Sequence, residues 1–536
     1  MSEPSVVPNV SRAGQIMFVS LFLSRVLGIV RDQVMVWTFG RTEMTDAYRW
    51  AFQIPDMLFF LIAGGALSSA FIPVFSEYLH TDRKKEAWHI FSVVTTTMSL
   101  IVAAFIALAF VFTTPMSQWV APGPQADAVR EHIVSMSHIL LPAQFAFFIG
   151  GLMFGALYAH QRFAVPGLGP NVYNIGIIFG ALVISHFMVP GIYGMSWGAL
   201  AGAVVGSFLI PLWAMRQVQP EFRPSLDLRH PGVKKVFRLM APVVFGLSLP
   251  GVYGMIMQAF SSFFEHGTAT AIELANRIMQ APLGVFGQSL AIAVFPALSQ
   301  FFAQQKMESY RRQLSTTLRT VIFLTVPISV ILVVLAPEIV ALLFQYGAKF
   351  GQQDTEIVAN CLRMFGIGVW AWCLHPVLMR AFFAIQQSFV PTLLGTATTA
   401  LFFLITWALI RTSLGYLALP LASSVSAIFL VAVLSFTVQS RVGGLDLVEI
   451  GSTLVKSLLA CIPLAVLLGA MAIGLPRGVG LSTNLWALVK VVGGGLAGVA
   501  IYSLVARKLK MPETQYVDRA LSRLTRGSPP AKPEGG

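Results

Sequence analysis

Residues 14–39 form the apolar stretch GQIMFVSLFLSRVLGIVRDQVMVWTF, which decides the fold class of this chain. As a helix, a run of this length crosses the roughly 30 Å hydrocarbon core of a bilayer. It nevertheless carries Arg25, Arg31 and Asp32 in its middle and second half. A charge at membrane depth costs at least about 2.5 kcal/mol and is retained where it faces a cavity or a partner inside the protein. The stretch therefore predicts a transmembrane helix whose side chains handle a charged species within the membrane.

The composition of the whole chain is that of an integral membrane protein. Of its 536 residues, 56% are hydrophobic and 11% are charged, against roughly 25% charged in soluble domains. The first apolar run is too long and too charged for the apolar core of a cleaved signal peptide, so we expect no cleaved leader. The cysteines Cys361, Cys373 and Cys461 lie in apolar runs without the spacing of a disulfide or zinc site, and we expect them to be packing residues.

Apolar runs of about 20 residues recur along the chain and predict fourteen transmembrane spans. They cover residues 14–38, 47–79, 87–113, 131–159, 164–188, 192–215, 237–263, 269–302, 316–344, 356–386, 390–410, 415–438, 452–474 and 483–506. The predicted fold class is therefore an all-α polytopic membrane protein.

The basic residues of the loops predict the orientation of these spans. Loops on one side carry clusters of Lys and Arg within 83–85, 216–238, 306–319 and 507–532. The other side carries only Arg41, Arg130, Lys349, Arg411 and Arg477. Because basic loops stay in the cytoplasm, both termini are predicted to be cytoplasmic. Most of the net charge of +13 is explained in this way, and we expect no nucleic-acid partner.

An internal repeat divides the first twelve spans into two halves. The segment Ala156–Gln161 recurs as Ala381–Gln386, and each copy is followed by a Val-Pro pair. Leu67, Pro73 and Ser76 likewise recur as Leu290, Pro296 and Ser299. An offset of six spans keeps both copies in the same orientation, which predicts parallel repeats around a midplane cavity. The alternative is that two loop–helix junctions are similar without wider homology.

The second span carries features of a helix that bends. Pro55 removes a helical hydrogen bond, and the small residues Ala63–Ala66 permit close helix approach or local bending. Such a helix suits a protein that changes state, although small-residue patches also serve static packing. We expect static packing for the glycines at 198, 202 and 206 and for those at 494 and 498.

The remaining basic residues lie within or near the ends of the spans. For Arg363, Arg380, Lys456 and Lys490 we favour snorkelling or a structural ion pair. Arg31 and Arg277 lie deeper and are favoured as cavity-lining residues, and for Arg25 the two interpretations are balanced. His132 and His138 are six residues apart and do not share a helix face, so we expect no metal site.

Several of these motifs resemble those of the MurJ/MviN family of lipid II flippases. The similar segments are Ser24–Asp32, Phe39-Gly40, Thr45–Tyr48, Gly65–Pro73, Ala121–Gly123, Arg162-Phe163, Ala275–Ile278, Phe344–Gly347 and Arg380–Ala384. They cover nearly the whole chain in the family's order. The resemblance implies the multidrug/oligosaccharidyl-lipid/polysaccharide exporter fold, with two six-helix lobes and two additional C-terminal helices that form a groove for a lipid tail.

The resemblance also implies a substrate and a site. The substrate is the undecaprenyl-pyrophosphate-linked peptidoglycan precursor, lipid II, moved from the cytoplasmic to the outer leaflet by alternating access. Arg25, Arg31 and Arg277 are implied to line the cavity and contact the diphosphate, a role that suits guanidinium groups. Asp32 and Asp46 match acidic positions of the family, and we expect Asp32 to partner an arginine or to form part of a gate.

One departure from the family concerns the second span. Relatives carry a basic residue soon after the Ile-Pro pair and an acid before the Gly-Ala of the small run, where this chain has Phe59 or Phe60 and Gly64. Our hypothesis is that Arg49, on the same helix, supplies the missing positive charge.

Two other function classes remain alternatives. A relative in the same superfamily would export another polyprenyl-linked glycan or a drug, but a cation exporter favours acids where this chain has arginines. A membrane enzyme requires a carboxylate or histidine cluster, and the sequence has none, so we expect no catalytic residues and no cofactor. Residues 239–264 and 391–445 contain no Asp or Glu, which disfavours a carboxylate-based cation site in spans seven, eleven and twelve. Coupling to the membrane potential stays open.

The expected organisation follows from these observations. A cytoplasmic segment (1–13) precedes the N-lobe (14–220) and the C-lobe (221–440), then come the last two spans with the lipid-tail groove (441–511) and an unordered cytoplasmic tail (512–536). We expect a monomer in the inner membrane of a bacterium, in contact with membrane lipids and its lipid substrate.

Overall fold

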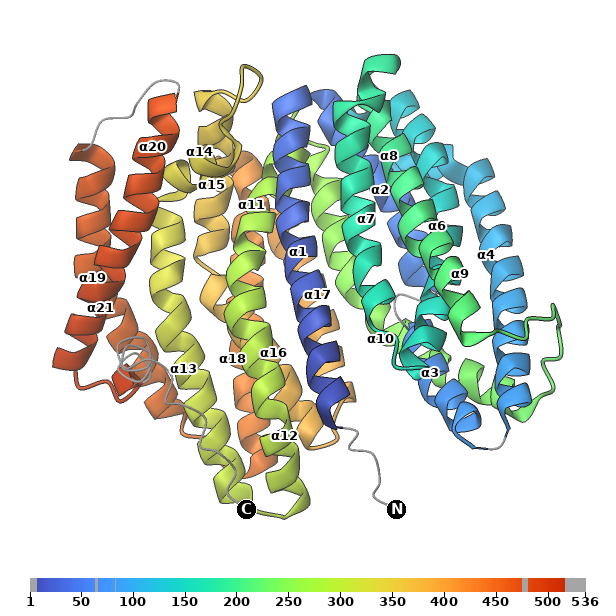
Figure 1. Ribbon diagram of the computed structural model, residues 1–536. Helices are drawn as coiled ribbons and strands as arrows, with labels where there is room; N and C mark the ends of the chain where they lie inside the picture. Colours follow the sequence, from blue (N-terminus) through green and yellow to red (C-terminus); the bar gives the residue numbers. More distant parts are fainter. Residues whose placement is uncertain (1–6, 63–65, 82, 475–480, 516–536) are drawn as a thin grey trace. The chain divides into compact units, whose positions relative to one another are not determined.

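The computed structural model describes residues 7–62, 66–81, 83–474 and 481–515. Within these residues the secondary structure is entirely helical, with turns and loops between the helices (Figure 1). Gly64, most of the small-residue run at 63–66 and the tail from 516 lie outside the described residues. The predictions made for them therefore stay predictions.

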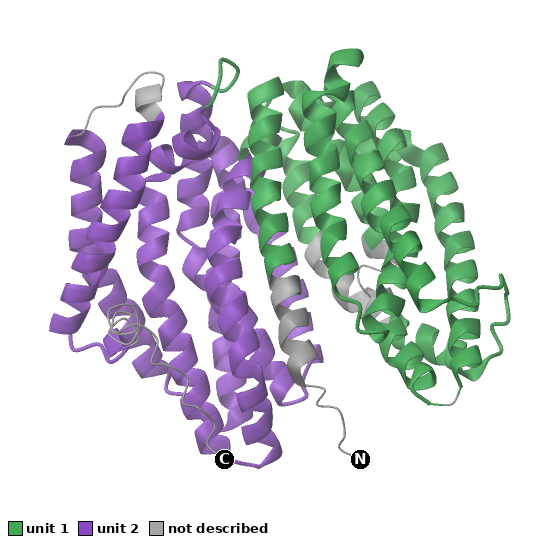
Figure 2. Ribbon diagram, viewed as in Figure 1, with its two compact units in different colours: residues 1–271, 346–350 green, residues 272–345, 351–536 purple. Residues whose placement is uncertain are grey.

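Packing divides the chain into two compact units (Figure 2). The first comprises residues 1–271 and 346–350, and the second comprises residues 272–345 and 351–536. The division falls at 271 because α10 packs against α2, α3 and α4 of the first unit. The lobe boundary at 220 rests on the internal repeat and stays a prediction.

Among its described residues, the first unit contains ten α-helices. They are α1 (Val7–Phe39), α2 (Glu43–Ile62), α3 (Ala66–Leu79), α4 (Lys84–Val120), α5 (Pro124–Asp127), α6 (Arg130–Ala159), α7 (Ala164–Leu182), α8 (Tyr193–Ala203), α9 (Ile210–Met215) and α10 (Pro231–Ser261). The π-helical segment η2 (Val204–Leu209) joins α8 to α9, so these elements form one continuous helix. The next helix, α11 (Thr268–Pro282), begins in this unit and continues into the second.

The second unit contains the rest of the chain. Its helices are α12 (Ser289–Ala303), α13 (Met307–Val334), α14 (Ala336–Phe344), α15 (Gln352–Gly366), α16 (Val369–Ala384), α17 (Phe389–Leu409), α18 (Ala418–Val442), α19 (Leu447–Gly474), α20 (Leu481–Leu488) and α21 (Gly495–Lys508). The π-helical segments η4 (Leu283–Gln288) and η6 (Val489–Gly494) join α11 to α12 and α20 to α21.

The helices confirm the predicted fold class. Among the described residues, nine helices are long and apolar enough to cross a membrane, and the bent pair α15–α16 makes a tenth. The four other predicted spans coincide with α1, with α2 and α3 together, with α7 and with α10. The ninth predicted span differs in detail, since α13 ends at Val334 and the short helix α14 follows at Ala336.

The internal repeat has a structural counterpart at the ends of α6 and α16. Gln161 and Gln386 both adopt a left-handed conformation, with φ of 58° and 59°. In each copy the next residue donates its backbone N–H to the carbonyl five residues earlier, at 2.8 Å in the first and 2.9 Å in the second. This is a Schellman ending, which satisfies the last carbonyl groups of a helix. Equivalent endings at repeat-related positions support the division into two similar halves.

Glycines allow α7 and α8 to pack backbone to backbone, as expected for static packing. A Cβ atom on Gly198 would lie 2.3 Å from the carbonyl oxygen of Gly176, and one on Gly180 would lie 2.3 Å from that of Gly194. Close approach of this kind is how small residues stabilise helix pairs in membranes. Because α7 also packs against α1, the glycines help to fix the wall against which the charged residues of α1 lie.

Candidate functional site

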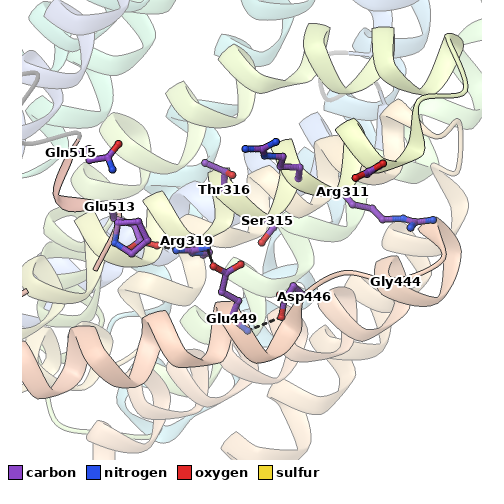
Figure 3. A pocket seen from close by; sticks show the side chains of 12 residues that line it. Arg311, Ser315, Thr316, Arg319, Gly444, Asp446, Glu449, Glu513 and Gln515 are labelled. Carbon is purple, nitrogen blue, oxygen red and sulfur yellow. Dashed lines mark hydrogen bonds and ion pairs between the residues drawn. The ribbon is translucent and has the colours of Figure 1, made fainter. Parts of the chain in front are cut away.

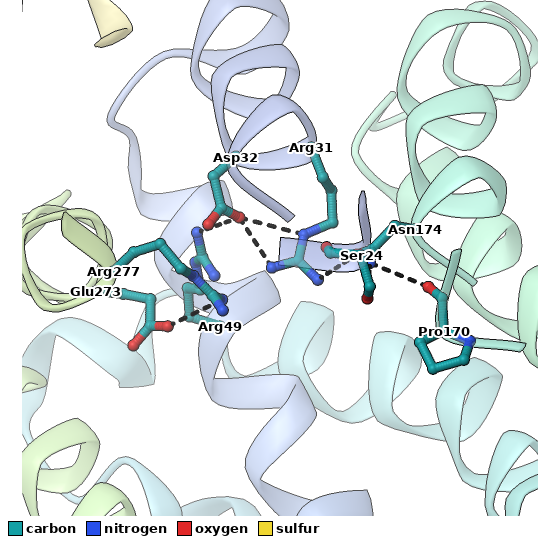
Figure 4. A network of polar contacts seen from close by, with 8 residues as sticks. All are labelled: Ser24, Arg31, Asp32, Arg49, Pro170, Asn174, Glu273 and Arg277. Carbon is teal, nitrogen blue, oxygen red and sulfur yellow. Dashed lines mark hydrogen bonds and ion pairs between the residues drawn. The ribbon is translucent and has the colours of Figure 1, made fainter. Parts of the chain in front are cut away.

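Charged residues of α1 and α2 meet in one network inside the first unit (Figure 4). Arg31 donates from Nε and Nη2 to Oδ1 of Asp32, at 3.2 and 3.1 Å. Arg49 donates from Nη2 to the same oxygen at 3.3 Å. Two guanidinium groups thus converge on one carboxylate. Asp32 is thus paired with Arg31 and with Arg49.

A tight reversal of the chain explains why these residues meet. Gly40 ends α1 with φ of 74°, a conformation that a side chain would strain. The chain then turns back, and α2 begins at Glu43. Asp32 lies eight residues before Gly40 and Arg49 nine residues after it, so the hairpin of α1 and α2 brings them to the same level.

The network is buried and carries an excess of positive charge. The exposed fractions of the side chains are 1% for Asp32, 10% for Arg49 and 16% for Arg31. Buried charges of this kind are retained when they are paired. These three residues together carry one net positive charge. Nε of Arg49 is also buried without a hydrogen-bond partner among the described residues, so the network has a donor to offer to an anion.

Helix α7 contributes a polar contact that the sequence analysis missed. Nη1 of Arg31 donates to Oδ1 of Asn174 at 3.3 Å, and Nδ2 of Asn174 donates to the carbonyl of Ser24 at 3.3 Å. One turn earlier, Nδ2 of Asn171 donates to the carbonyl of Ser20 at 3.3 Å. Two asparagines three residues apart in an apolar helix are a visible signal, because buried amides require partners.

Arg25 lies on the same face of α1 as Asp32, nearer the start of the helix. The two residues are seven positions apart, which places them about 10.5 Å apart along the helix axis. The side chain of Arg25 is exposed. Among the predicted arginines of the first unit, the network therefore brings together Arg31 and Arg49, and Arg25 stands about two turns away.

The position of the missing family base is apolar in this protein. The ring of Phe59 lies 5.7 Å from that of Phe148 and packs against the hydrophobic core of the unit. The side chain of Phe60, like Gly64, lies outside the described residues. Arg49 is therefore the residue of α2 whose positive charge reaches Asp32.

Asp46 has a separate role at the start of α11. Its Oδ2 accepts from the backbone N–H of Gly267 at 2.6 Å, and its Oδ1 accepts from the backbone N–H and hydroxyl of Thr270 at 2.8 and 2.7 Å. The side chains of Asp46 and Thr270 are both fully buried. A carboxylate at this place satisfies free N–H groups of a helix N-terminus and is favoured by the helix dipole.

The second unit holds the predicted residue Arg277 on α11. Its Nη2 donates to Oε1 of Glu273, one turn earlier, at 3.3 Å (Figure 4). The side chain of Arg277 is 33% exposed. This pair is a half-exposed charged site, in contrast to the buried network of α1 and α2.

Other predicted residues have structural partners. Lys490 forms an ion pair with Glu338 at 3.6 Å, which confirms the favoured interpretation of this lysine. Nη1 of Arg363 donates to Asn360 at 2.7 Å, and the Arg380 guanidinium lies over the ring of Phe295, 5.2 Å from its centroid. The three cysteines are buried, and in the described part of the chain none of them forms a disulfide. No cluster of His, Cys, Asp and Glu in the described residues is arranged to hold a metal ion.

Sequence comparisons find similar proteins along most of the chain. The profile of the family described as "Lipid II flippase MurJ" matches residues 35–488. The "Lipid II flippase MurJ" of Burkholderia cenocepacia is 30% identical over 379 residues, which cover 69% of this chain and 72% of that protein. The "Probable lipid II flippase MurJ" of Vibrio cholerae is 26% identical over 450 residues, which cover 81% of this chain and 84% of that protein.

Solved structures share the fold. The structure described as "Lipid II flippase MurJ, inward closed conformation" matches with a TM-score of 0.75 and 22% identity, over 92% of this chain and 99% of that chain. An inward-facing multidrug resistance MATE family transporter of the MOP superfamily matches with a TM-score of 0.67 and 15% identity, over 80% of this chain and 98% of that chain. At these identities the likeness concerns the fold alone.

Proposed function

The chain belongs to the MurJ family of lipid II flippases, and from this premise we propose that its Arg31–Asp32–Arg49 network binds the diphosphate of lipid II. The protein is a multi-pass membrane transporter and not an enzyme. The proposal concerns which residues hold the substrate and how they release it.

The chemistry of the substrate sets the requirement. A diphosphate that enters the membrane loses water and needs charged hydrogen-bond donors in its place. Arginine supplies planar, permanently charged donors that bind phosphate oxygens in pairs. The observation that carries the proposal is the buried pair Arg31 and Arg49, which has one carboxylate between two guanidiniums and an unused donor at Nε of Arg49.

Asp32 acts in this proposal as an internal substitute for the substrate. Its carboxylate holds both guanidiniums in place when no diphosphate is bound, which avoids two unpaired buried charges. A diphosphate offers more oxygens than a carboxylate and competes for the same donors. Asp32 is therefore a gating or ion-pair residue, and its strength as a competitor sets how readily the substrate enters and leaves.

Two further arginines complete the proposed set. Arg25, about two turns from Asp32 on the same helix face, contributes an exposed positive charge on the approach to the network. Arg277 supplies a positive charge from α11, with Glu273 as its partner in the absence of substrate. Asp46 belongs to the proposed gate, because it joins α2 of the predicted N-lobe to the start of α11 in the predicted C-lobe.

We further propose the orientation and oligomeric state expected from the sequence. The basic loops support cytoplasmic termini, and a monomer suffices because one chain carries both predicted lobes. Large exposed apolar side chains on α19 and α21, among them Leu458, Val466 and Leu496, support a surface for the lipid tail.

The test is complementation of a bacterial strain depleted of its own lipid II flippase. Wild type is expected to restore growth, and Arg31→Ala, Arg49→Ala and Arg277→Ala are expected to fail at equal membrane abundance. Arg411→Ala is the matched control, because this arginine of the second unit stacks on Trp407 at 3.9 Å in the turn after α17. Normal lipid II transport by Arg49→Ala would show that this arginine does not replace the missing family base. Failure of correctly inserted wild type would favour another polyprenyl-linked substrate.

A further inference from the structure

A second polar site lies in the second unit and is lined by residues that the proposed function does not use. It is a cavity of about 660 Å³ between the first turns of α13, the start of α19 and the chain at 512–515 (Figure 3). Its charged and hydroxyl-bearing lining residues are Glu308, Arg311, Arg312, Ser315, Thr316, Arg319, Asp446, Glu449 and Glu513. Residues 512–515 were expected in an unordered tail, but Glu513 is 97% buried there, with an exposed fraction of 3%.

Two buried polar atoms of this cavity lack a partner. Oε2 of Glu513 and Oγ of Ser315 make no hydrogen bond with any described residue. Both residues are more than nine-tenths buried and both line the cavity. Orphaned buried polar atoms are rare in proteins and point to a missing partner. Oε2 of Glu513 can only accept, so the partner at this end of the cavity is a donor.

Two of the three arginines of the cavity already bond other residues, and the third does not bond any described residue. Arg319 forms ion pairs with Glu449 and with Oε1 of Glu513, the latter at 2.6 Å. Arg311 donates from Nε to the carbonyl of Val442 at 2.6 Å. Arg312 makes no hydrogen bond or ion pair with another residue in the described part of the chain. Its guanidinium is therefore available to an anion.

The available donor Arg312 and the residue that holds Glu513, Arg319, lie on one face of α13. Arg312, Ser315 and Thr316 are spaced so that they share a helix face with Arg319, which holds Glu513. From Arg312 to Arg319 the helix rises about 10.5 Å, and both side chains can bend toward a ligand between them. A ligand with an anionic group at one end and a cationic donor at the other fits this arrangement.

The cavity lies at the depth of lipid headgroups. The first thirteen residues of α13, MESYRRQLSTTLR, are mostly polar, and the helix becomes apolar from Thr320 onward. This polar-to-apolar change marks the boundary between the headgroup layer and the hydrocarbon core. The cavity is lined by residues on the polar side of that boundary.

We propose that this cavity binds the phosphoethanolamine headgroup of a membrane lipid. Arg312 and the hydroxyl groups of Ser315 and Thr316 hold the phosphate. Oε2 of Glu513 accepts from the ammonium group, and Asp446 and Glu449 are further carboxylates of the same lining. The site is independent of lipid II binding at the Arg31–Asp32–Arg49 network.

The charge balance of the lining favours a zwitterion over a purely anionic lipid. Three arginines face four carboxylates, so the lining carries one net negative charge. A phosphate alone gains the arginine contacts but meets Oε2 of Glu513, the carboxylate oxygen that no described residue bonds. An ammonium group on the same ligand removes that conflict. Phosphatidylglycerol, which has the phosphate and no ammonium, is the matched comparison.

The test uses the purified full chain in detergent and native mass spectrometry with added lipids of identical acyl chains. Phosphatidylethanolamine is expected to bind about tenfold more tightly than phosphatidylglycerol, a difference of one charge-assisted hydrogen bond. Arg312→Ala and Glu513→Gln are each expected to weaken binding about tenfold. Arg223→Ala and Glu221→Gln, both exposed in the loop before α10, are the controls with unchanged binding.

Each other outcome counts against the proposal. Equal binding of the two lipids overturns the ammonium site, and unchanged binding by Arg312→Ala overturns the phosphate site. Competition by soluble phosphoethanolamine supports headgroup recognition, whereas tighter binding of the soluble compound than of the lipid overturns the lipid source. Glu513→Gln also weakens the ion pair between Arg319 and Glu513. If this variant does not fold, Arg312→Ala is the decisive one.

Discussion

Arg49 on α2 donates to Asp32 on α1 at 3.3 Å, and both side chains are at least nine-tenths buried. The contact joins two helices on either side of a tight turn and places a carboxylate between two guanidiniums, since Arg31 bonds the same oxygen. Its position within membrane-spanning helices makes it both a structural element of the first unit and the centre of the proposed diphosphate site.

Removal of the shared carboxylate is expected to destabilise the protein more than removal of either arginine. Asp32→Ala leaves the two guanidiniums without their shared carboxylate. Breaking a buried ion pair costs about 3–5 kcal/mol of stability. In Arg49→Ala the carboxylate keeps Arg31 as its partner, so we expect a smaller loss of stability. Thermal unfolding in detergent measures the order, and an equal loss for both variants would contradict the shared role of Asp32.

Arg31→Lys is expected to reduce lipid II transport while it preserves the charge. Arg31 contacts Asp32 through two nitrogens and Asn174 through a third, and an ammonium group cannot reproduce that planar fork. We expect transport in reconstituted vesicles to fall about tenfold, in line with the loss of one charged hydrogen bond. Arg411→Lys is the control. Full activity of Arg31→Lys would mean that charge alone suffices.

Asp46→Asn is expected to weaken the link between α2 and the start of α11. The amide retains one acceptor oxygen but places an NH₂ group against a backbone N–H, either of Gly267 or of Thr270. We expect a loss of about 1.5–3 kcal/mol, typical of hydrogen bonds to a charged group.

Thr270→Val provides the graded comparison for Asp46, because it removes only the hydroxyl bond to the carboxylate. Its expected loss of stability is smaller, about 1 kcal/mol. A larger effect for Thr270→Val than for Asp46→Asn in thermal unfolding would show that the carboxylate is not the centre of this link.

Gly198→Val is expected to disrupt the first unit. A Cβ at this position would lie 2.3 Å from the carbonyl oxygen of Gly176, and backbone cannot move away cheaply inside a packed helix pair. Gly395→Ala in α17 is the control, because a Cβ there meets nothing within 4 Å, and helix propensity predicts a gain of up to about 1 kcal/mol. Folded yield after extraction into detergent distinguishes the two.

The buried pair Lys490 and Glu338 is expected to behave as a coupled unit. Their side chains are 2% and 7% exposed, so Lys490→Met strands a buried carboxylate at a cost of about 3–5 kcal/mol. The double variant Lys490→Met with Glu338→Gln is expected to recover most of that loss. Additive losses in the double variant would show that the two residues do not depend on each other.

The positions of the helices follow from the sequence more closely than the contacts between the helices do. Fourteen apolar runs correspond to single, bent or broken helices because the bilayer requires each crossing segment to satisfy its own backbone hydrogen bonds. The length of apolar runs therefore predicts where the helices lie, although their ends differ by up to nine residues, since α13 begins at Met307 and its predicted span at 316. The break after Val334 was missed because the apolar run continues through α14 without a change in composition.

The candidate site was predicted in part. Arg31 and Asp32 were predicted because charges within a membrane are costly. Arg49 was predicted because relatives carry a basic residue in the second span where this chain has Phe59 or Phe60. Asn174 was missed because the pair Asn171 and Asn174 signals that buried amides need partners but does not say which residues those partners are. The cavity around Glu513 was missed for a similar reason, since its lining comes from three segments between residues 308 and 515.

By itself, the sequence determined that this is a helical membrane protein, which segments span the bilayer, and which charges are too costly to be incidental. These properties depend on local composition and on transfer from water to lipid. Only the tertiary structure decided that Arg31 and Arg49 share one carboxylate, that Asp46 caps α11, and that Oε2 of Glu513 is left without a partner. These relationships depend on distances between residues remote in the chain, which packing sets and composition does not encode.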